Sequence, residues 1–224
     1  FLWIGTQDGV NRFDGVKFHT YRHGPGDEGS LSDGLVLALA EARDGRIWVG
    51  TERGGLNLLD PQSDLTKRYE LYHLGPWMTD AADSTVAVRE GRTVYGIAET
   101  SEDELILTTD LGLVELVPSS GHARLVAVGG DRTAAGRSVV CALHDGAALA
   151  GFRDGEVQGI RPGRERNVVV ARLPHGVSAL YCPKEGPPFA ATLGGDVYRV
   201  SVDPPGVDHL LTVEPRPGER LRIR

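Results

Sequence analysis

Arg46-Ile-Trp-Val-Gly-Thr51, followed by Gly55-Leu-Asn-Leu-Leu-Asp60, is the stretch that decides the fold. The same pair of segments occurs earlier as Phe1-Leu-Trp-Ile-Gly-Thr6 and Gly9-Val-Asn-Arg-Phe-Asp14, so that the two tryptophans lie 45 residues apart. Three weaker copies follow at spacings of 58, 43 and about 41 residues. A period of ~40–50 residues is typical of propeller blades, so the chain is a repeat protein.

One complete repeat can be divided into strands from residue 31 to residue 74. Gly34-Leu-Val-Leu-Ala-Leu-Ala-Glu41 is a continuous apolar run, as expected of a strand that is buried on both faces. Asp44-Gly45 is a hairpin signal, and Pro61 ends the third run because proline has no N–H to donate. Four strands joined by short turns form an antiparallel meander, which buries its two faces only by stacking on further copies.

The predicted fold is therefore all-β, a β-propeller built from consecutive four-stranded antiparallel blades. The expected blades cover residues 1–22 (a partial blade), 31–74, 91–128, 136–172 and 175–213, and residues 216–224 are expected to begin the next. We expect residues 1–224 to be an incomplete part of a larger ring of about seven blades. The alternative is that Arg220-Leu-Arg-Ile-Arg224 completes the first blade and closes a five-bladed ring, but its alternating charges differ from the apolar inner strands.

Composition narrows the classes of partner and compartment. The 224 residues include 30 glycines and carry a formal charge of −7, which argues against nucleic acid as a partner because phosphate binding needs a basic surface. No apolar run reaches the ~18 residues that a membrane-spanning helix requires. Cys141 and Cys182 both lie in apolar runs, and we expect them to be buried free thiols rather than a bridge.

Three segments of the second repeat resemble the two-component regulator propeller repeat. They are Leu31-Ser-Asp-Gly-Leu-Val36, Ala40-Glu-Ala-Arg-Asp-Gly-Arg-Ile-Trp-Val-Gly-Thr51 and Gly54-Gly-Leu-Asn-Leu-Leu-Asp-Pro61. The resemblance implies a periplasmic, ligand-binding sensor in an inner-membrane histidine kinase, hybrid two-component protein or diguanylate cyclase. It further implies a signalling domain in the same full-length chain, and a small molecule or an oligosaccharide as the ligand.

The sequence gives no positive sign of catalysis, of a cofactor or of a metal site. The seven histidines are scattered among the repeats, and His19 and His23 would lie ~13 Å apart on a strand, too far to share a metal ion. We therefore expect this part of the protein not to be an enzyme. An interaction or dimerisation scaffold, including a homodimer, is the alternative function, and a propeller lyase or hydrolase comes third.

Candidate binding residues come from the turns between the second and third strands, which share one face of a propeller with the connectors between blades. Each of four repeats places a charged or amide group there, and the candidates are Asp8, Glu52, Arg53, Asp110, Arg153 and Asp154, with Gln7 beside them. Trp77 lies in an extra segment between two blades, either packed under that segment or available to stack on a sugar. Trp3, Trp48, Gly5 and Gly50 share two repeat positions and are expected in the core.

Overall fold

The computed structural model describes residues 1–69, 93–101, 103–127, 138–163 and 167–213, and these form strands and turns without any helix. No helix able to cross a membrane is found in these ranges. The strands form one three-stranded and four four-stranded antiparallel sheets, each in chain order. This is the predicted β-propeller architecture of consecutive antiparallel blades.

Each sheet is one blade, and the blades are numbered along the chain. The first contains β1 (Leu2–Thr6), β2 (Gly9–Phe13) and β3 (Phe18–Tyr21). The second contains β4 (Val36–Glu41), β5 (Ile47–Thr51), β6 (Leu56–Asp60) and β7 (Leu65–Tyr69). The third contains β8 (Val94–Ser101), β9 (Glu104–Thr109), β10 (Gly112–Val117) and β11 (His122–Ala127). The fourth contains β12 (Val139–Ala142), β13 (Ala148–Gly151), β14 (Glu156–Ile160) and β15 (Val168–Arg172). The fifth contains β16 (Val177–Tyr181), β17 (Phe189–Thr192), β18 (Asp196–Val202) and β19 (Pro205–Thr212).

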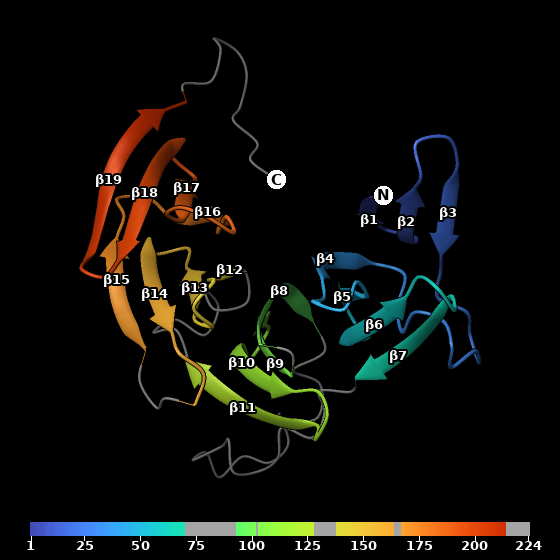
Figure 1. The fold of residues 1–224 in the computed structure, drawn as a ribbon. Coiled ribbons are helices and arrows are strands. Elements are labelled where there is room, and N and C mark those ends of the chain that lie inside the picture. The colour runs from blue at the N-terminus through green and yellow to red at the C-terminus, as the bar shows by residue number, and fades with distance from the viewer. Residues whose placement is uncertain (70–92, 102, 128–137, 164–166, 214–224) are drawn as a thin grey trace.

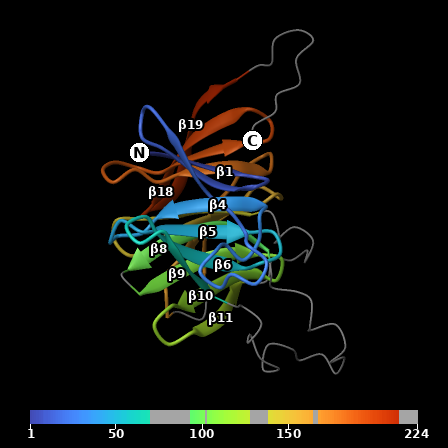
Figure 2. The same ribbon diagram turned by 90° about the vertical axis from the view of Figure 1, so that its right-hand side faces the viewer.

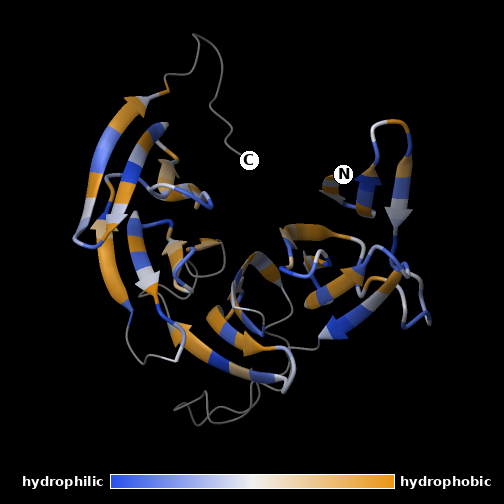
Figure 3. Cartoon of the chain, viewed as in Figure 1, coloured by the Kyte–Doolittle hydropathy of each residue, from blue (hydrophilic) through white to orange (hydrophobic). Residues whose placement is uncertain are grey.

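The five blades follow one another around an arc, with the first strand of each full blade towards the centre and the last strand at the rim (Figure 1). In the perpendicular view, the strands of the first three blades follow one another from top to bottom (Figure 2). Hydrophobic residues run along most strands, and hydrophilic residues gather in the turns and on parts of rim strands such as β7 (Figure 3). The described blades leave a gap between β1–β3 and β16–β19, so the ring size stays a prediction.

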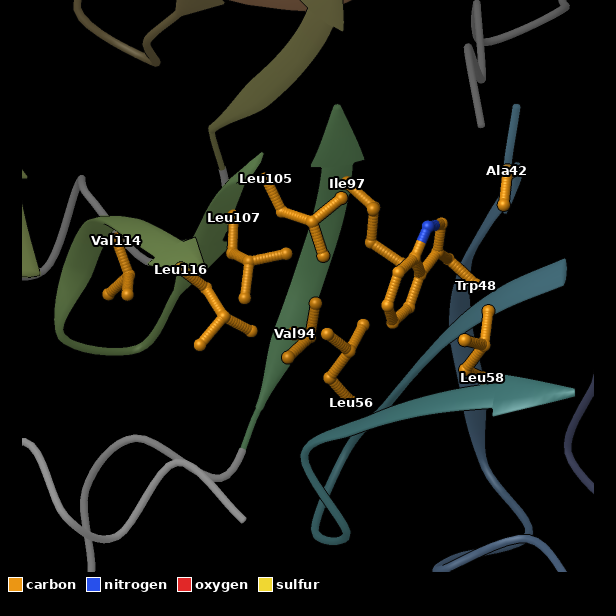
Figure 4. Packing of buried hydrophobic residues seen from close by; sticks show 10 residues of the cluster. All are labelled: Ala42, Trp48, Leu56, Leu58, Val94, Ile97, Leu105, Leu107, Val114 and Leu116. Atoms are coloured by element: carbon orange, nitrogen blue, oxygen red, sulfur yellow. The ribbon is translucent and has the colours of Figure 1, made fainter. Parts of the chain in front are cut away.

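Trp48 marks the packing between the second and third blades. Its side chain is 3% exposed and belongs to a cluster that includes Leu58 of its own blade and Ile97 of β8 (Figure 4). The indole nitrogen lies 3.5 Å from a carboxylate oxygen of Glu99, at the far end of β8. The same carboxylate accepts the backbone N–H of Arg43 at 2.7 Å, so Glu99 also holds the β4–β5 turn of the preceding blade.

The glycine of the Trp-x-Gly-Thr motif allows the next blade to approach closely. A Cβ atom added to Gly50 would lie 2.8 Å from both the carbonyl oxygen and a methyl group of Val94. Gly151 stands in the same relation to Val177, at 2.5 Å. Val94 and Val177 each precede a register shift in their strand, so a local bulge presents the valine to the glycine.

Two expected core positions are more open than the sequence indicates. Trp3 is only half-buried and Gly5 is exposed, although a Cβ added to Gly5 would lie 2.7 Å from Val36. The reason is that β1 is an edge strand in the described chain, with no inner strand paired beside it. Residues 216–224, which we expect to begin a further blade, lie outside the described residues.

The expectation of free thiols is wrong, because Cys141 and Cys182 form a disulfide with a Cα–Cα distance of 5.8 Å. The two cysteines are 41 residues apart, which is one repeat. Residues one repeat apart occupy neighbouring blades, so Cys141 on β12 and Cys182 directly after β16 meet between the fourth and fifth blades. The bridge therefore ties these two blades together through their inner strands.

Replacing Trp48 by alanine should remove the centre of the cluster between the second and third blades. We expect Trp48→Ala to lower the free energy of unfolding by about 3–5 kcal/mol through the cavity that it leaves. Trp3→Ala is the matched control and should cost clearly less, because Trp3 is only half-buried. Urea unfolding measures both free energies. A loss below about 1 kcal/mol for Trp48→Ala would show that the indole ring does not stabilise the interface between the second and third blades.

Candidate functional site: the turn face

The turns between the second and third strands lie at the same end of their blades as the connectors that enter the next blade. We call this end the turn face; it comprises residues 6–9, 52–55, 109–112, 152–155 and 192–196 with connectors 30–35 and 173–176. Backbone hydrogen bonds join these segments within a blade and between neighbouring blades. Gly9 N–H donates to Gly34 O at 2.8 Å, Glu52 N–H to Leu35 O at 3.0 Å, and Val177 N–H to Phe152 O at 2.8 Å.

A threonine hydroxyl closes most of the turns and explains the last residue of the Trp-x-Gly-Thr motif. Thr51 Oγ1 donates to Gly55 O at 3.0 Å and accepts the N–H of Gly54 at 3.1 Å. Thr6 and Thr109 make the same pair of bonds in the first and third blades. These local bonds fix the turn backbone, so the residues at the turn tips can vary in charge.

Arg53 and Glu52 lie at the tip of the turn in the second blade. The Arg53 guanidinium is 80% exposed and its Nε lies 3.3 Å from a Glu52 carboxylate oxygen. The backbone below them is held by Asp33, whose carboxylate accepts N–H bonds from Arg53 at 3.0 Å and from Gly34 at 2.8 Å. The structure thus presents an exposed cation on a fixed backbone.

The other predicted residues occupy separate positions along the face. Asp8 pairs with Arg22 at 2.7 Å, and Asp110 is a half-buried residue of the β9–β10 turn. Arg153 and Asp154 are exposed at the tip of the β13–β14 turn, where the Asp154 carboxylate accepts the Glu156 N–H at 2.9 Å.

Arg53 belongs to the second blade and Arg153 to the fourth, so the third blade separates the two turns that carry them. Trp77 lies outside the described residues. Within the described ranges, no group of three or more His, Cys, Asp or Glu side chains is placed to hold a metal ion.

Residues from connectors and rim strands complete the face, and the turn pattern alone misses them. They include Arg22 and Asp33, which adjoin predicted residues, and a polar group at the fifth blade. There, Asp196 accepts a hydrogen bond of 2.6 Å from Thr212 Oγ1 and lies 3.3 Å from His209 Nε2. The hydrogen bond from Thr212 lowers the pKa of the Asp196 carboxyl below its usual value, and His209 adds to this effect. The sequence offers one signal by which Arg22 and Asp33 could be found. Arg22 directly follows β3, and Asp33 lies in the connector before β4.

Comparison with known proteins identifies the repeat. The family described as two-component regulator propeller matches residues 30–53, which contain Asp33, Trp48, Gly50 and Arg53. Residues 30–53 carry the repeat of two-component regulator propellers. A histidine kinase of Formosa agariphila is 55% identical over 31 residues, which are 14% of this chain and 2% of that kinase.

The propeller fold itself is shared with solved structures of low sequence identity. The extracellular domain of a protein assigned to hybrid two-component systems in B. thetaiotaomicron aligns with 95% of this chain, at a TM-score of 0.72 and 16% identity. An auxiliary nutrient binding protein from Bacteroides ovatus aligns with 92% of the chain, at a TM-score of 0.59 and 13% identity. The chain spans 27% of the first of these proteins and 53% of the second, so the propeller repeats described here correspond to a part of each.

Asp33 should stabilise the turn face more than the surface ion pair of Asp8 does. Its carboxylate accepts two backbone N–H groups, and such bonds to a charged group contribute roughly 1–3 kcal/mol. We expect Asp33→Ala to lower the free energy of unfolding by that amount, whereas Asp8→Ala, which removes an exposed pair, should cost about 0–1 kcal/mol. Denaturant titration of both variants tests this order, and equal losses would contradict it.

Proposed function

We propose that the chain is the extracytoplasmic, ligand-binding sensor propeller of a bacterial signal-transduction protein and is not itself catalytic. The observation that carries the proposal is the propeller repeat of residues 30–53 in a chain whose fold matches extracellular domains of hybrid two-component systems over 94–95% of its length. The similarity to a histidine kinase supports a signalling domain elsewhere in the full-length chain. A membrane anchor in the same chain belongs to this proposal.

The disulfide supports an extracytoplasmic location. Disulfides persist in oxidising compartments such as the bacterial periplasm and are rare in the reducing cytosol. Cys141 and Cys182 are joined, and no cysteine in the chain is left as a thiol. A structural bridge between two blades is therefore compatible with the compartment in which a periplasmic sensor domain works.

The ligand that fits the turn face is a small molecule or an oligosaccharide rather than nucleic acid. The turn tips carry both signs of charge, with Glu52 beside Arg53 and Asp154 beside Arg153, whereas a phosphate backbone requires a surface of one sign. Paired acceptors and donors spaced along the face suit an extended ligand with many hydroxyl groups. Trp77 remains our proposed stacking partner for a sugar ring, on the argument from its place in the sequence.

Arginine substitutions on the turn face test the sensor function in the whole protein. With an oligosaccharide that changes the signalling output, Arg53→Ala and Arg153→Ala should each require roughly tenfold to a hundredfold more ligand, because each removes a charged hydrogen bond. Arg46→Ala is the control, since Arg46 lies in the same blade as Arg53 but in the β4–β5 turn at the opposite end. Phosphorylation or reporter output against ligand concentration gives the shift.

The outcomes separate the functions. Unchanged responses in both arginine variants would move the ligand site away from the turn face. If no small molecule or oligosaccharide binds the protein or alters its output, the sensor proposal fails, and an interaction scaffold, including a homodimer, takes its place.

The disulfide gives a second, independent test. Protein trapped in acid directly from cells should take up a thiol-alkylating reagent only after reduction, at both Cys141 and Cys182. A Cys141→Ser, Cys182→Ser variant should lose roughly 2–4 kcal/mol of stability. Adding reductant should destabilise the native protein by a similar amount and leave this variant unchanged. Two reactive thiols before reduction would contradict the extracytoplasmic location.

A further inference from the structure

A groove of about 450 Å³ lies between the fourth and fifth blades, at the strand ends opposite to the turn face. It is bounded by the β12–β13 turn, by the loop from β16 to β17 and by β18 with β19. A second hollow of about 220 Å³ shares Leu143 and Val202 with it and extends it along the fourth blade. We call the two hollows together the interblade groove.

The walls of the groove are fixed by covalent and backbone constraints. Cys182 lines the groove and is bonded to Cys141 of the fourth blade, so the two sides are held at a set separation. The β16–β17 loop contributes Pro183, Pro187 and Pro188, and the carbonyl of Pro188 accepts the Val200 N–H at 2.8 Å. A groove with such walls exists before any ligand arrives, which lowers the entropic cost of binding.

The floor is apolar and the rim is charged, and four of the five Asp and Arg side chains that line the groove form two ion pairs. Leu143 and Val202, both half-buried, supply aliphatic surface. Above it, Asp145 pairs with Arg161 at 3.0 Å, and Arg199 pairs with Asp208 at 3.5 Å. All four charged side chains are between 38% and 73% exposed, so each can still bond to a ligand.

We propose that the interblade groove is a ligand site for an uncharged, hydroxyl-bearing ring compound of one or two sugar rings. Each ion pair offers a carboxylate acceptor beside guanidinium donors, which matches hydroxyl groups because a hydroxyl both donates and accepts. The two pairs cancel in charge and leave Asp203, an exposed carboxylate in the lining of the second hollow, so the groove disfavours an anion. The aliphatic floor fits the C–H face of a ring, and the volume lies within the range of small-molecule sites, roughly 300–1,000 Å³.

This site goes beyond the function proposed above, because it lies at the other end of the blades from Arg53 and Arg153. The two sites can therefore be tested separately. A compound that binds in the groove should bind Arg53→Ala as tightly as it binds the unaltered protein, whatever the outcome on the turn face.

The experiment uses the whole protein with methyl β-D-glucopyranoside and cellobiose as neutral probes, and glucuronate and glucosamine as charged probes. Saturation-transfer NMR and calorimetry measure binding up to millimolar concentration. Val202→Phe fills the point that the two hollows share, and should weaken the neutral probes at least tenfold. Leu65→Phe is the matched control, an exposed site on β7 of the second blade, and should leave the binding constants unchanged.

A charge variant tests why the ligand is neutral. Asp208→Asn leaves Arg199 without its carboxylate partner, so the neutral probes should bind roughly three- to tenfold more weakly and glucuronate should gain by a similar factor. Glu185→Gln removes a carboxylate from the β16–β17 loop outside the groove lining and should change neither. The proposal is overturned if no neutral probe binds, if Val202→Phe binds them normally, or if the unaltered protein prefers glucuronate or glucosamine.

Discussion

The close contact between a valine of one blade and a glycine of the preceding blade is the constraint on which the arrangement of the blades depends. An inner strand lies directly against the second strand of the previous blade at Gly5, Gly50 and Gly151, where an added Cβ atom would clash with a valine, whereas the third blade has the buried Thr108 at this position. The large residue two positions earlier in the motif then fills the wider part of the same interface, as Trp48 does against Ile97. A small and a large residue therefore lie two positions apart on the face of β5 that packs against the third blade.

This constraint explains why much of the fold can be predicted from one repeat. The aromatic residue of the motif fills the interface, the glycine admits the next strand, and Thr51 and its equivalents close the turn. Where copies diverge, the position survives although the residue type changes, as with Phe189, which is paired with Tyr181 as Trp48 is paired with Ala40. Repeat spacing and hydrophobic pattern are sufficient for this inference because every blade must meet its neighbour in a similar way.

The sequence could predict much less of the candidate site, for physical reasons. The residues at the turn tips can be predicted from their position in the repeat. The carboxylate that accepts the backbone N–H of Arg53 belongs to Asp33, which comes from the connector before β4. Such a partner depends on how two backbones cross, and a single sequence does not contain that geometry. The disulfide is missed for a different reason: the apolar surroundings of Cys141 and Cys182 favour free thiols, although a separation of one repeat already places the two residues in adjacent blades.

The two ends of the blades differ in what they contribute to the molecule. At the turn face the backbone is tied by hydrogen bonds within the turns and between neighbouring blades, and the turns hold two to four residues. At the opposite end the turns vary more in length, and a groove lies where the five-residue β12–β13 turn meets the seven-residue, proline-rich loop between β16 and β17. Residues that repeat hold the blades together, and residues that do not repeat are available for recognition. It follows that the repeat motif reveals the architecture of this protein, whereas the ligand sites that we propose are argued from the positions at which the copies disagree.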